Sequence, residues 1–553
     1  MVKTSQLSYD SGIASEPLLG ETIGANLERS VARWPNAEAL VSCHQSLRYT
    51  YWQFDAAVNE LARGLMALGL QVGDRVGIWS PNYAEWALLQ FATAKVGVIL
   101  VNINPAYRTH ELSYVLKHSG CRVLVAAPSF KTSDYRAMLE AALPEVPTLE
   151  RAIFLFSGDW NDLLRGCGAV SMEALRERAD GLQFDDPINI QYTSGTTGFP
   201  KGATLSHHNL LNNGYFLGEG FRYTERDRVC IPVPLYHCFG MVIGNLAATS
   251  HGACMVYPEA SFDAGATLRA IQAERCTSLL GVPTMFIAQL GHEDFDSTDC
   301  SSLRTGMMAG SPCPVEVMKQ VTTRMNMPEV GIGYGMTETS PVSTQTSIDD
   351  SLAHRTGTVG RVMPHLEIKI VDTGTGRVVP RGTSGEFCTR GYSVMLGYWN
   401  EDQKTAEAID RAGWMHTGDL AVMDDDGYVS VVGRIKDLII RGGENVYPRE
   451  IEEFLYAHPD IADVQVIGVP DEKYGEEVMA WVRLAEHADP ARMNAQTLRE
   501  FCQGRIAHYK IPRYVKVTQE FPMTVTGKIR KMEMREVSIT ELGLQYPAAV
   551  KKA

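Results

Sequence analysis

The 553-residue sequence has no excess of positive charge, and this absence excludes one broad class of function. Its 51 lysines and arginines are outnumbered by 65 aspartates and glutamates, which gives a formal net charge of -14. Nucleic-acid binders need a basic surface to neutralise phosphates, so we expect no nucleic-acid partner. An acidic chain can still bind a nucleotide, because a local loop and a magnesium ion can offset the phosphate charge.

The sequence also lacks paired cysteines. Its eleven cysteines are scattered and odd in number, and none is spaced as Cys-x-x-Cys. This pattern does not indicate a disulfide framework, and it is typical of a reducing compartment in which buried thiols act as small apolar residues.

Long hydrophobic runs are missing as well. The most apolar segment, 86–103, is interrupted by Gln90 and Lys95, which favours a helix followed by a buried strand over a membrane span. The first thirty residues have one base before Arg29 and lack an apolar core, so we expect neither a signal peptide nor a transit peptide. These features predict a cytoplasmic protein without an integral membrane segment.

Alternating helical and strand patterns are present through the first half of the chain. They predict helices packed on a mostly parallel sheet. From about Thr356 the segments shorten, and Leu366, Ile368 and Ile370 alternate with charged residues as in a strand. After Gly433 a smaller α/β unit begins, with a helix starting at Pro448.

The predicted fold class is therefore α/β. We expect a large N-terminal domain of helix-flanked sheets at 1–435, which includes a small β-barrel-like subdomain at about 341–435. A small, mobile α/β domain should follow at 436–553.

The segment 192–202, YTSGTTGFPKG, has the composition of an anion-binding loop. Its glycines allow close approach of the backbone, its hydroxyls can donate hydrogen bonds, and Lys201 supplies a cation. It is not the common GxxxxGK[ST] pattern, because Gly202 follows the lysine. A flexible surface turn remains the alternative when this segment is taken alone.

The setting of this loop supports anion binding. The apolar run 187–193 predicts a strand before it, and Ser206 can cap a helix after it. We therefore expect the loop to lie between a strand end and a helix start, where backbone N–H groups are available to an anion.

Four later segments carry groups that suit a nucleotide. Tyr334 in GYGMTET could stack on a base, and Glu338 could hold magnesium. Asp419 in WMHTGDLA could accept both ribose hydroxyls, Arg434 precedes a Gly-Gly turn, and Lys528 follows a glycine in PMTVTGKIRK. Each has a structural alternative, such as a core tyrosine, a capping aspartate or a surface lysine, but their joint order favours one nucleotide site.

These motifs closely resemble those of the adenylate-forming superfamily, which contains acyl-CoA synthetases, luciferases and peptide-synthetase adenylation domains. The resemblance runs from about residue 20 to 540. The segment 232–242, PVPLYHCFGMV, is most similar to the medium-chain acyl-CoA synthetase family member 2 group and related bacterial fatty-acid ligases.

The resemblance implies a two-step reaction with ATP, Mg²⁺ and coenzyme A. A carboxylate attacks the α-phosphate of ATP to give an acyl-adenylate and pyrophosphate, and the thiol of coenzyme A then displaces AMP. The catalytic residues that it implies are Lys528, Glu338, His237 and Thr193, with Glu338 as the metal residue. The implied ATP- and AMP-binding residues are Thr193, Ser194, Gly195, Thr196, Thr197, Gly198, Lys201, Gly310, Tyr334, Gly335, Met336, Thr337, Asp419, Arg434 and Lys528.

The resemblance also implies that the small domain rotates about a hinge at Lys436 between the two steps. Rotation withdraws Lys528 and brings a turn to the active site for coenzyme A. The residues of this turn are Arg441, Gly442, Gly443 and Glu444.

His237 adjoins the acyl carboxylate or gates the acyl tunnel in the family, and a core histidine bonded to the backbone is the alternative. The predicted acyl pocket consists of His237, Phe239, Gly240, Met241, Val242, Gly335 and Met336. His207 and His208 diverge on a helix and make a poor metal pair, so they are interpreted as a helix start. Asp424, Asp425 and Asp426 lack the EF-hand spacing, so we expect no calcium site.

The sequence thus predicts a fatty acyl-CoA ligase for medium to long chains, with a small-molecule carboxylic acid, ATP and CoA as partners. A homodimer is an allowed assembly. The alternatives are an aryl-CoA ligase, an enzyme that loads a carrier protein, and a non-catalytic nucleotide-binding protein.

Overall fold

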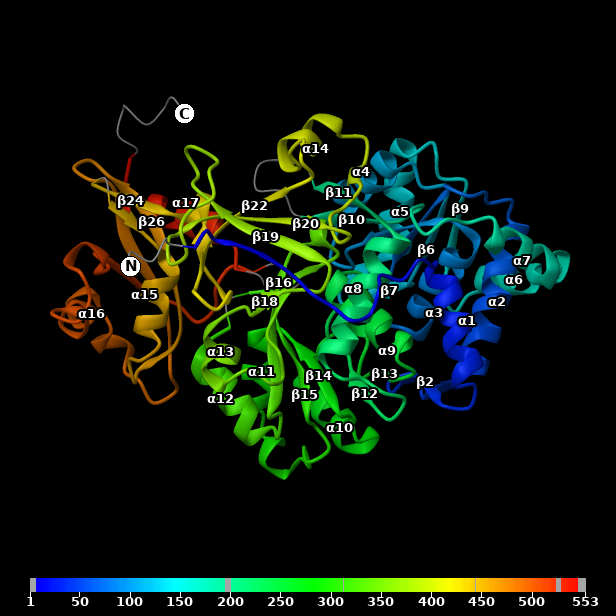
Figure 1. Ribbon diagram of the computed structural model, residues 1–553, viewed down its shortest axis with the longest axis horizontal. Helices are drawn as coiled ribbons and strands as arrows, with labels where there is room; N and C mark the ends of the chain where they lie inside the picture. The colour runs from blue at the N-terminus through cyan, green and yellow to red at the C-terminus, as the bar shows by residue number, and fades with distance from the viewer. Residues whose placement is uncertain (1–5, 194–199, 312, 443, 524–528, 546–553) are drawn as a thin grey trace. The chain divides into compact units, whose positions relative to one another are not determined.

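The computed structural model describes residues 6–193, 200–311, 313–442, 444–523 and 529–545. Helices and strands alternate over most of this length, so the chain is a mixed α/β protein as predicted (Figure 1). The chain divides into two compact units. The large unit contains Asp10–Ile368 and Thr389–His416, and the small unit contains Met1–Tyr9, Lys369–Cys388 and Thr417–Ala553.

The large unit contains a seven-stranded sheet. Five of its strands, β10, β5, β4, β6 and β9, run parallel to their neighbours and are joined through helices, as parallel pairing requires. Two further strands add antiparallel at one edge. In spatial order the strands are β21 (Gly397–Tyr398), β11 (Lys201–Ser206), β10 (Pro187–Thr193), β5 (Ile99–Ile103), β4 (Arg75–Trp79), β6 (Val123–Ala126) and β9 (Arg151–Phe154).

A nine-stranded sheet forms the second layer of strands in the large unit. Its central strands run parallel, and its outer strands β17, β18 and β3 pair antiparallel. In spatial order the strands are β18 (Arg361–Val362), β17 (Val342–Gln345), β16 (Glu329–Gly335), β15 (Thr305–Met308), β14 (Ser278–Gly281), β12 (Arg228–Cys230), β13 (Cys254–Tyr257), β2 (Glu38–Ser42) and β3 (Leu47–Thr50).

Helices pack on both sheets of the large unit, and α1, α2 and α3 lie together in Figure 1. The helices are α1 (Ile23–Arg33), α2 (Tyr51–Ala67), α3 (Ala84–Val96), α4 (Thr109–Ser119), α5 (Tyr135–Ala142), α6 (Gly158–Arg165), α7 (Met172–Asp180), α8 (His207–Gly220), α9 (Ala247–Ser250), α10 (Ala264–Glu274), α11 (Pro283–Leu290), α12 (Val315–Arg324), α13 (Leu352–Gly357) and α14 (Asp402–Ala408). The π-helix η3 (Phe239–Leu246) and the short 3₁₀ helix η5 (Thr337–Thr339) carry predicted site residues.

Helix α3 explains the most apolar stretch of the sequence. Every residue of this helix except Glu85 is buried, which is expected of a helix that is apolar on all sides. The ammonium of Lys95, only 1% exposed, lies 2.8 Å from a carboxylate oxygen of Glu28 and 2.7 Å from one of Asp55. The prediction of a helix followed by a buried strand is confirmed, because α3 leads into β5.

The setting of the glycine-rich loop differs from the prediction. The run after the loop, Lys201–Ser206, is strand β11, which pairs with β10 on one side and β21 on the other. The loop therefore joins two antiparallel strands, and helix α8 begins only after β11. The predicted cap is confirmed, because the hydroxyl of Ser206 accepts a hydrogen bond from the backbone N–H of Asn209 at 3.1 Å.

The small unit has a C-terminal sheet with its own apolar core. Strands β24 (Ile439–Arg441), β25 (Glu444–Val446), β26 (Ile461–Asp471), β27 (Gly475–Leu484) and β28 (Tyr514–Val517) form this sheet. Helices α15 (Pro448–Leu455), α16 (Ala495–Cys502) and α17 (Lys531–Leu542) belong to the same unit. The predicted helix start at Pro448 is confirmed, and Ile451 and Leu455 of this helix are buried in the core.

A second five-stranded sheet contains β1 (Tyr9–Ser11), β19 (Leu366–Val371), β20 (Gly385–Gly391), β22 (Met415–Met423) and β23 (Val429–Arg434). The division between the units falls within β19, β20 and β22. The strands of 341–435 are thus shared among three sheets, since β17 and β18 belong to the nine-stranded sheet and β21 to the seven-stranded one. The boundary at residue 435 and the barrel-like subdomain stay predictions.

In the part of the chain that the structure describes, no helix has both the length and the apolar character needed to cross a membrane. All eleven cysteines lie within the described ranges, and all are free thiols.

Candidate nucleotide site

The two ends of the glycine-rich loop are held together by the β10–β11 hairpin. Thr193 and Lys201 are directly opposite each other at the end of this antiparallel ladder. The hydroxyl of Thr193 lies 3.4 Å from the backbone oxygen of Lys201. The loop residues predicted to bind phosphates lie outside the described residues; they are Ser194, Gly195, Thr196, Thr197 and Gly198.

Glu338 places a buried carboxylate beside this hairpin. It lies on η5, is 5% exposed, and its backbone oxygen accepts a hydrogen bond from the N–H of Met395 at 2.9 Å. Its Oε1 lies 3.5 Å from the hydroxyl of Thr193 and accepts a hydrogen bond from the phenol of Tyr398 at 2.8 Å. The structure thus brings together two of the predicted catalytic residues, Thr193 and Glu338.

Lys201 contacts the same phenol. Its ammonium donates to the hydroxyl of Tyr398 at 3.0 Å, and its Nζ lies 4.1 Å from the centroid of the tyrosine ring. Burial, and then the negative charge of Glu338, raise the pKa of Tyr398 well above its ordinary value. The tyrosine therefore stays a neutral phenol between a cation and a carboxylate.

The predicted adenine-binding residues lie at the ends of two neighbouring parallel strands. Met308 of β15 is opposite Ile332 of β16, so Gly310 and Tyr334 both follow at the carboxyl edge of the sheet. Ligands of open α/β sheets bind at this edge. A Cβ at Gly335 would overlap the carbonyl oxygen of Pro341, so the close approach of the two chain segments requires glycine there.

The remaining residues of this segment lead to the carboxylate. Met336 is partly buried, and its backbone N–H donates to the hydroxyl of Thr339 at 3.1 Å. Thr337 is buried and begins η5, which places Glu338 one residue later. The segment therefore connects the predicted adenine side of the site with its carboxylate.

His237 precedes the π-helix that carries most of the predicted acyl pocket. Its Nδ1 accepts the backbone N–H of Phe239 at 3.2 Å, and its backbone oxygen accepts those of Gly240 and Met241. The neutral ring in this arrangement carries its proton on Nε2. A Cβ at Gly240 would overlap the backbone of Pro234, so this glycine permits the tight entry into η3.

The side chain of Met241 lies against the seven-stranded sheet. It is 1% exposed, and its sulfur accepts from the side-chain amides of Gln191 at 3.1 Å and Asn102 at 3.2 Å. Gln191 also accepts from the thiol of Cys238, whose pKa is raised to about 12, chiefly by burial. Phe239 and Val242 are buried on the same helix. Met241 of the predicted acyl pocket thus contacts Gln191 of β10, the strand that leads into the glycine-rich loop.

The predicted ribose pair lies in the small unit. Asp419 of β22 and Arg434 of β23 are directly opposite each other, and Arg434 Nε lies 3.0 Å from Asp419 Oδ1. Asp419 is 7% exposed, and its backbone N–H donates to the hydroxyl of Thr417 at 3.1 Å. Sequence reasoning paired these two residues only through the family resemblance, and their adjacency follows from the hairpin.

The predicted hinge and the coenzyme A turn also belong to the small unit. Lys436 lies on a short 3₁₀ helix (Ile435–Asp437), and desolvation and then the charge of Arg434 lower its pKa. Arg441 ends β24, Gly442 has the positive φ of 62°, and the exposed Glu444 begins β25. Gly443 and Lys528 lie outside the described residues.

Arg441 contacts two residues that the sequence did not indicate, Glu477 and Tyr474. Its guanidinium donates to the carboxylate of Glu477 at 2.6 Å and lies 4.2 Å from the ring centroid of Tyr474. Glu477 is only 1% exposed. The backbone N–H of Gly442 donates to the carbonyl oxygen of Tyr474 at 2.8 Å. These contacts fix one end of the predicted coenzyme A turn.

The two sequence features interpreted as structural have structural contacts. His207 begins α8, and its Nδ1 accepts the backbone N–H of Ile23 at 3.2 Å, whereas His208 lies 3.1 Å from the amide of Asn212. Asp424 Oδ1 accepts the backbone N–H groups of Asp426 and Tyr428, which stabilises the hairpin turn.

Tyr398 is the main site residue that the sequence did not indicate. It lies on the two-residue strand β21, where it is opposite Ala203 of β11. A single tyrosine in the run 397–400 carries no spacing or composition signal, and its position depends on pairing with a strand almost 200 residues earlier. A search for polar aromatic residues on strands that pair with the loop hairpin would have found it.

Comparison with known proteins is consistent with a nucleotide site in this chain. A family model described as AMP-binding enzyme matches residues 27–399, and one described as AMP-binding enzyme C-terminal domain matches 450–528. YngI of Bacillus subtilis, whose name places it among the acyl-CoA synthetases, is 48% identical over 95% of this chain and 99% of its own length. The mitochondrial medium-chain acyl-CoA ligase ACSF2 of Danio rerio is 45% identical over 98% of this chain and 92% of its own length.

Solved structures of related enzymes have a similar fold. An anthranilate CoA ligase, AuaEII, in complex with anthranoyl-AMP has a TM-score of 0.86 at 27% identity, covering 96% of this chain and 99% of that one. ATP-bound MatB of Rhodopseudomonas palustris has a TM-score of 0.81 at 29% identity, covering 95% and 100%. The fold is that of these enzymes, with a large N-terminal and a small C-terminal domain. The chain belongs to the AMP-binding enzyme family.

Proposed function

We propose that the protein is an ATP-dependent acyl-CoA ligase that acts on fatty acids of medium to long chain. In the first step the acid and ATP form an acyl-adenylate and pyrophosphate, and in the second coenzyme A displaces AMP to give the thioester. The observation that carries this proposal is similarity over nearly the whole chain to medium-chain acyl-CoA ligase ACSF2 and to YngI.

The charged groups of the large unit suit the first step. Lys201 offers an ammonium at the base of the loop hairpin, and fixed cations stabilise charge that builds on phosphate oxygens. Tyr334 and Gly310 lie at the strand ends where an adenine ring would be held. In the small unit, the carboxylate of Asp419 would accept the ribose hydroxyls while its ion pair with Arg434 keeps it oriented.

Glu338 fits a magnesium site of the kind found in phosphoryl and nucleotidyl transfer. Mg²⁺ is usually held by one or two carboxylates, with substrate phosphates completing its shell. Glu338 supplies one buried carboxylate with a hydroxyl nearby on Thr193. The ion would supply charge neutralisation on the phosphates when bound.

Lys528 is proposed as the residue that contacts the reacting carboxylate and the α-phosphate, and Lys436 as the hinge. The turn formed by Arg441, Gly442, Gly443 and Glu444 is proposed to face coenzyme A in the second step. His237, Phe239, Gly240, Met241, Val242, Gly335 and Met336 are proposed to form the acyl side of the site. The domain division at residues 435 and 436 is part of the same proposal.

Release of pyrophosphate, measured with and without coenzyme A over a panel of acids, tests the reaction and its substrate together. We expect activity with acids of six to sixteen carbons and an acyl-CoA product by mass spectrometry. Activity with aromatic acids alone would favour an aryl-CoA ligase, for which the fold similarity to an anthranilate CoA ligase provides a precedent. A product found on a carrier protein but not on coenzyme A would change the acceptor.

A cytoplasmic location is also proposed. It is supported by eleven free thiols, which are typical of a reducing compartment. The ACSF2 relatives are named as mitochondrial, so fractionation of the native cells is the direct test. Light scattering on the purified protein would decide between a monomer and the allowed homodimer.

A further inference from the structure

Tyr398 contacts the charged side chains of both Lys201 and Glu338. Its hydroxyl lies 3.0 Å from Lys201 Nζ and 2.8 Å from Glu338 Oε1. The directions of these hydrogen bonds are fixed by chemistry. An ammonium can only donate and an ionised carboxylate can only accept, so the phenol accepts from Lys201 and donates to Glu338.

The position of Tyr398 is determined by its backbone. Strand β21 pairs with β11, so that Tyr398 is opposite Ala203. Side chains two residues apart on a strand share a face, which places Lys201 on the same face as Ala203. The phenol of Tyr398 can therefore meet the lysine diagonally across the two strands.

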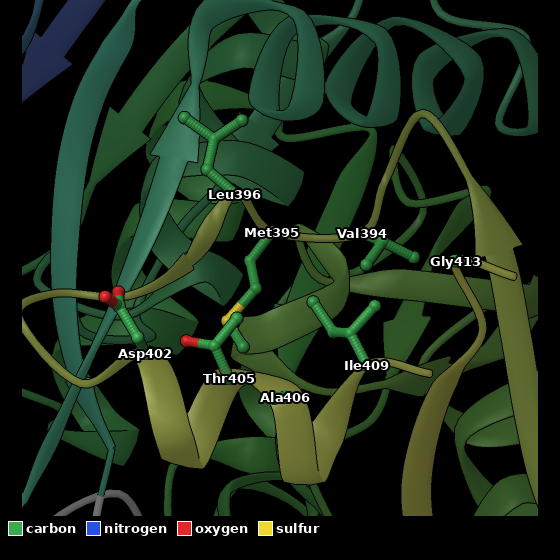
Figure 2. A pocket seen from close by; sticks show the side chains of 8 residues that line it. All are labelled: Val394, Met395, Leu396, Asp402, Thr405, Ala406, Ile409 and Gly413. Atoms are coloured by element: carbon green, nitrogen blue, oxygen red, sulfur yellow. The ribbon is translucent and has the colours of Figure 1, made fainter. Parts of the chain in front are cut away.

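Helix α14 holds the other side of this strand. Thr405 Oγ1 accepts the backbone N–H of Tyr398 at 2.8 Å and donates to the carbonyl of Glu401 at 3.0 Å. Thr405 and the segment before Tyr398 line a surface hollow of about 450 Å³, in which the side chains of Met395 and Thr405 approach each other (Figure 2). Gly397 has a φ of 150°, and a Cβ there would lie 2.9 Å from a side-chain carbon of Thr405.

Without the hydroxyl of Tyr398, the ammonium of Lys201 and the carboxylate of Glu338 would attract each other directly. Opposite charges this close attract more strongly near a protein surface than in bulk water, because the effective dielectric constant is lower there. A direct ion pair between Lys201 and Glu338 would occupy both the cation proposed for the phosphates and the carboxylate proposed for magnesium. In the structure the phenol hydroxyl of Tyr398 instead hydrogen-bonds to both groups.

We propose that Tyr398 is a positioning residue that keeps Lys201 and Glu338 apart, so that the carboxylate remains available to a divalent cation and the ammonium to phosphate. This inference rests on the proposed function, because it assumes that ATP and a divalent cation bind here. The alternative is that the tyrosine only satisfies buried polar groups, in which case its loss would affect stability without a specific effect on metal binding.

Tyr398→Phe removes one oxygen and tests this proposal. Binding of Mn²⁺ at saturating ATP, followed by electron paramagnetic resonance, reads the metal site directly. Loss of a hydrogen bond to a charged group typically weakens binding by about tenfold, and we expect a decrease in Mn²⁺ affinity of about that size. The Mg²⁺ concentration for half-maximal pyrophosphate release should rise in parallel, and excess Mg²⁺ should restore most of the rate.

Tyr223→Phe provides a matched control, because Tyr223 is a buried tyrosine of the same unit whose hydroxyl lies 2.6 Å from that of Ser278. It should melt at a lower temperature without a change in Mn²⁺ affinity. Equal Mn²⁺ affinity in wild type and Tyr398→Phe, with both proteins folded by thermal melting, would overturn the proposal.

A double-variant cycle with Lys201→Met separates positioning from a general structural role. If Tyr398 acts by preventing the ion pair, its removal should have little effect on Mn²⁺ affinity once Lys201 has lost its charge. An equal decrease in both backgrounds would contradict the proposal. Because the readout is Mn²⁺ binding, it stays informative even if no acid supports pyrophosphate release, a result that would instead refute the proposed function.

Discussion

Asp419 and Arg434 face each other across neighbouring antiparallel strands, with Arg434 Nε 3.0 Å from Asp419 Oδ1. They are separated by fifteen positions in the sequence, and the hairpin between them, with Gly427 in its turn at a φ of 87°, brings them together. Asp419 is 7% exposed, and its ion pair with Arg434 orients the carboxylate. A preorganised acceptor of this kind suits the two hydroxyls of a ribose.

Replacing Asp419 by Ala should weaken ATP binding, and more strongly than replacing Arg434 does. Hydrogen bonds to charged groups contribute about 1.5–3 kcal/mol each, so we expect the Kd for ATP to rise about 10–100-fold. Titration calorimetry measures this directly. Asp426→Asn, in the exposed turn of the same hairpin, is the matched control, and an unchanged Kd for Asp419→Ala would remove the residue from the nucleotide site.

The pairing of Arg441 with Glu477 predicts a selective effect on the second half-reaction. Glu477→Gln keeps the shape and an acceptor but removes the charge that holds Arg441 at 2.6 Å. We expect thioester formation from preformed acyl-adenylate to slow about tenfold, which corresponds to about 1.4 kcal/mol, while pyrophosphate release in the absence of coenzyme A changes little. Rapid-quench measurement of each half-reaction separates the two.

The exposed Glu472, on the loop that precedes β27, supplies the control for this prediction. Glu472→Gln should leave both half-reactions unchanged. A loss of buried charge pairing can also lower stability, so thermal melts of both variants are needed. Equal slowing of both half-reactions by Glu477→Gln would assign Glu477 a general structural role.

The strongly periodic and strongly apolar elements of the fold could be predicted from the sequence. The runs that became β4, β5, β10 and β19 are bounded by turn residues, and α3 is predominantly apolar and buried on nearly every side. Such local signals dominate when burial is nearly complete, because few alternatives bury the same surface.

Strand β11 could not be predicted in this way. Lys201–Ser206 combines a lysine, a glycine and two hydroxyl residues, and five of its six positions are buried although only Ala203 and Leu205 are apolar. Its strand conformation comes from pairing with β10 and with the distant β21. Tertiary pairing therefore overrode local propensity, and the expected strand–loop–helix became a hairpin followed by a helix.

The residues of the candidate site also divide into those that a local sequence motif marks and those that only tertiary contacts reveal. Glu338, Asp419 and Arg434 lie in motifs with recognisable composition, so the family resemblance selected them. Tyr398 and Glu477 hold those motifs in place from other elements, and no local pattern marks them. Residues that position a site are selected by three-dimensional contacts, which one sequence does not display.

Replacing Lys528 by Ala should abolish adenylate formation while ATP still binds. A cation that acts on charge developing in the transition state typically contributes about 100-fold or more to the rate. We therefore expect pyrophosphate release to fall by at least that factor with a nearly unchanged Kd for ATP. Lys516→Ala, which removes a lysine paired with Glu541 on the same unit, is the control, and full turnover in Lys528→Ala would exclude the assigned role.

His207 should make the stability of the large unit dependent on pH. The ring is 0% exposed, its Nδ1 accepts the N–H of Ile23, and burial lowers its pKa from 6.5 to about 3. Below pH 6.5 the unfolded chain binds a proton that the folded ring does not, so folding stability decreases as the pH falls. Between pH 8 and pH 5 the decrease from this residue should be about 2 kcal/mol.

Urea unfolding of wild type and His207→Gln at both pH values isolates this contribution, because the other titrating groups are common to the two proteins. Glutamine keeps an acceptor for Ile23 but has no proton to gain, so the variant should lose less stability on acidification. His208→Gln at the adjacent, partly exposed position is the control and should behave as the wild type does. If the acid-induced loss is the same in wild type and His207→Gln, the buried ring does not remain neutral through this pH range.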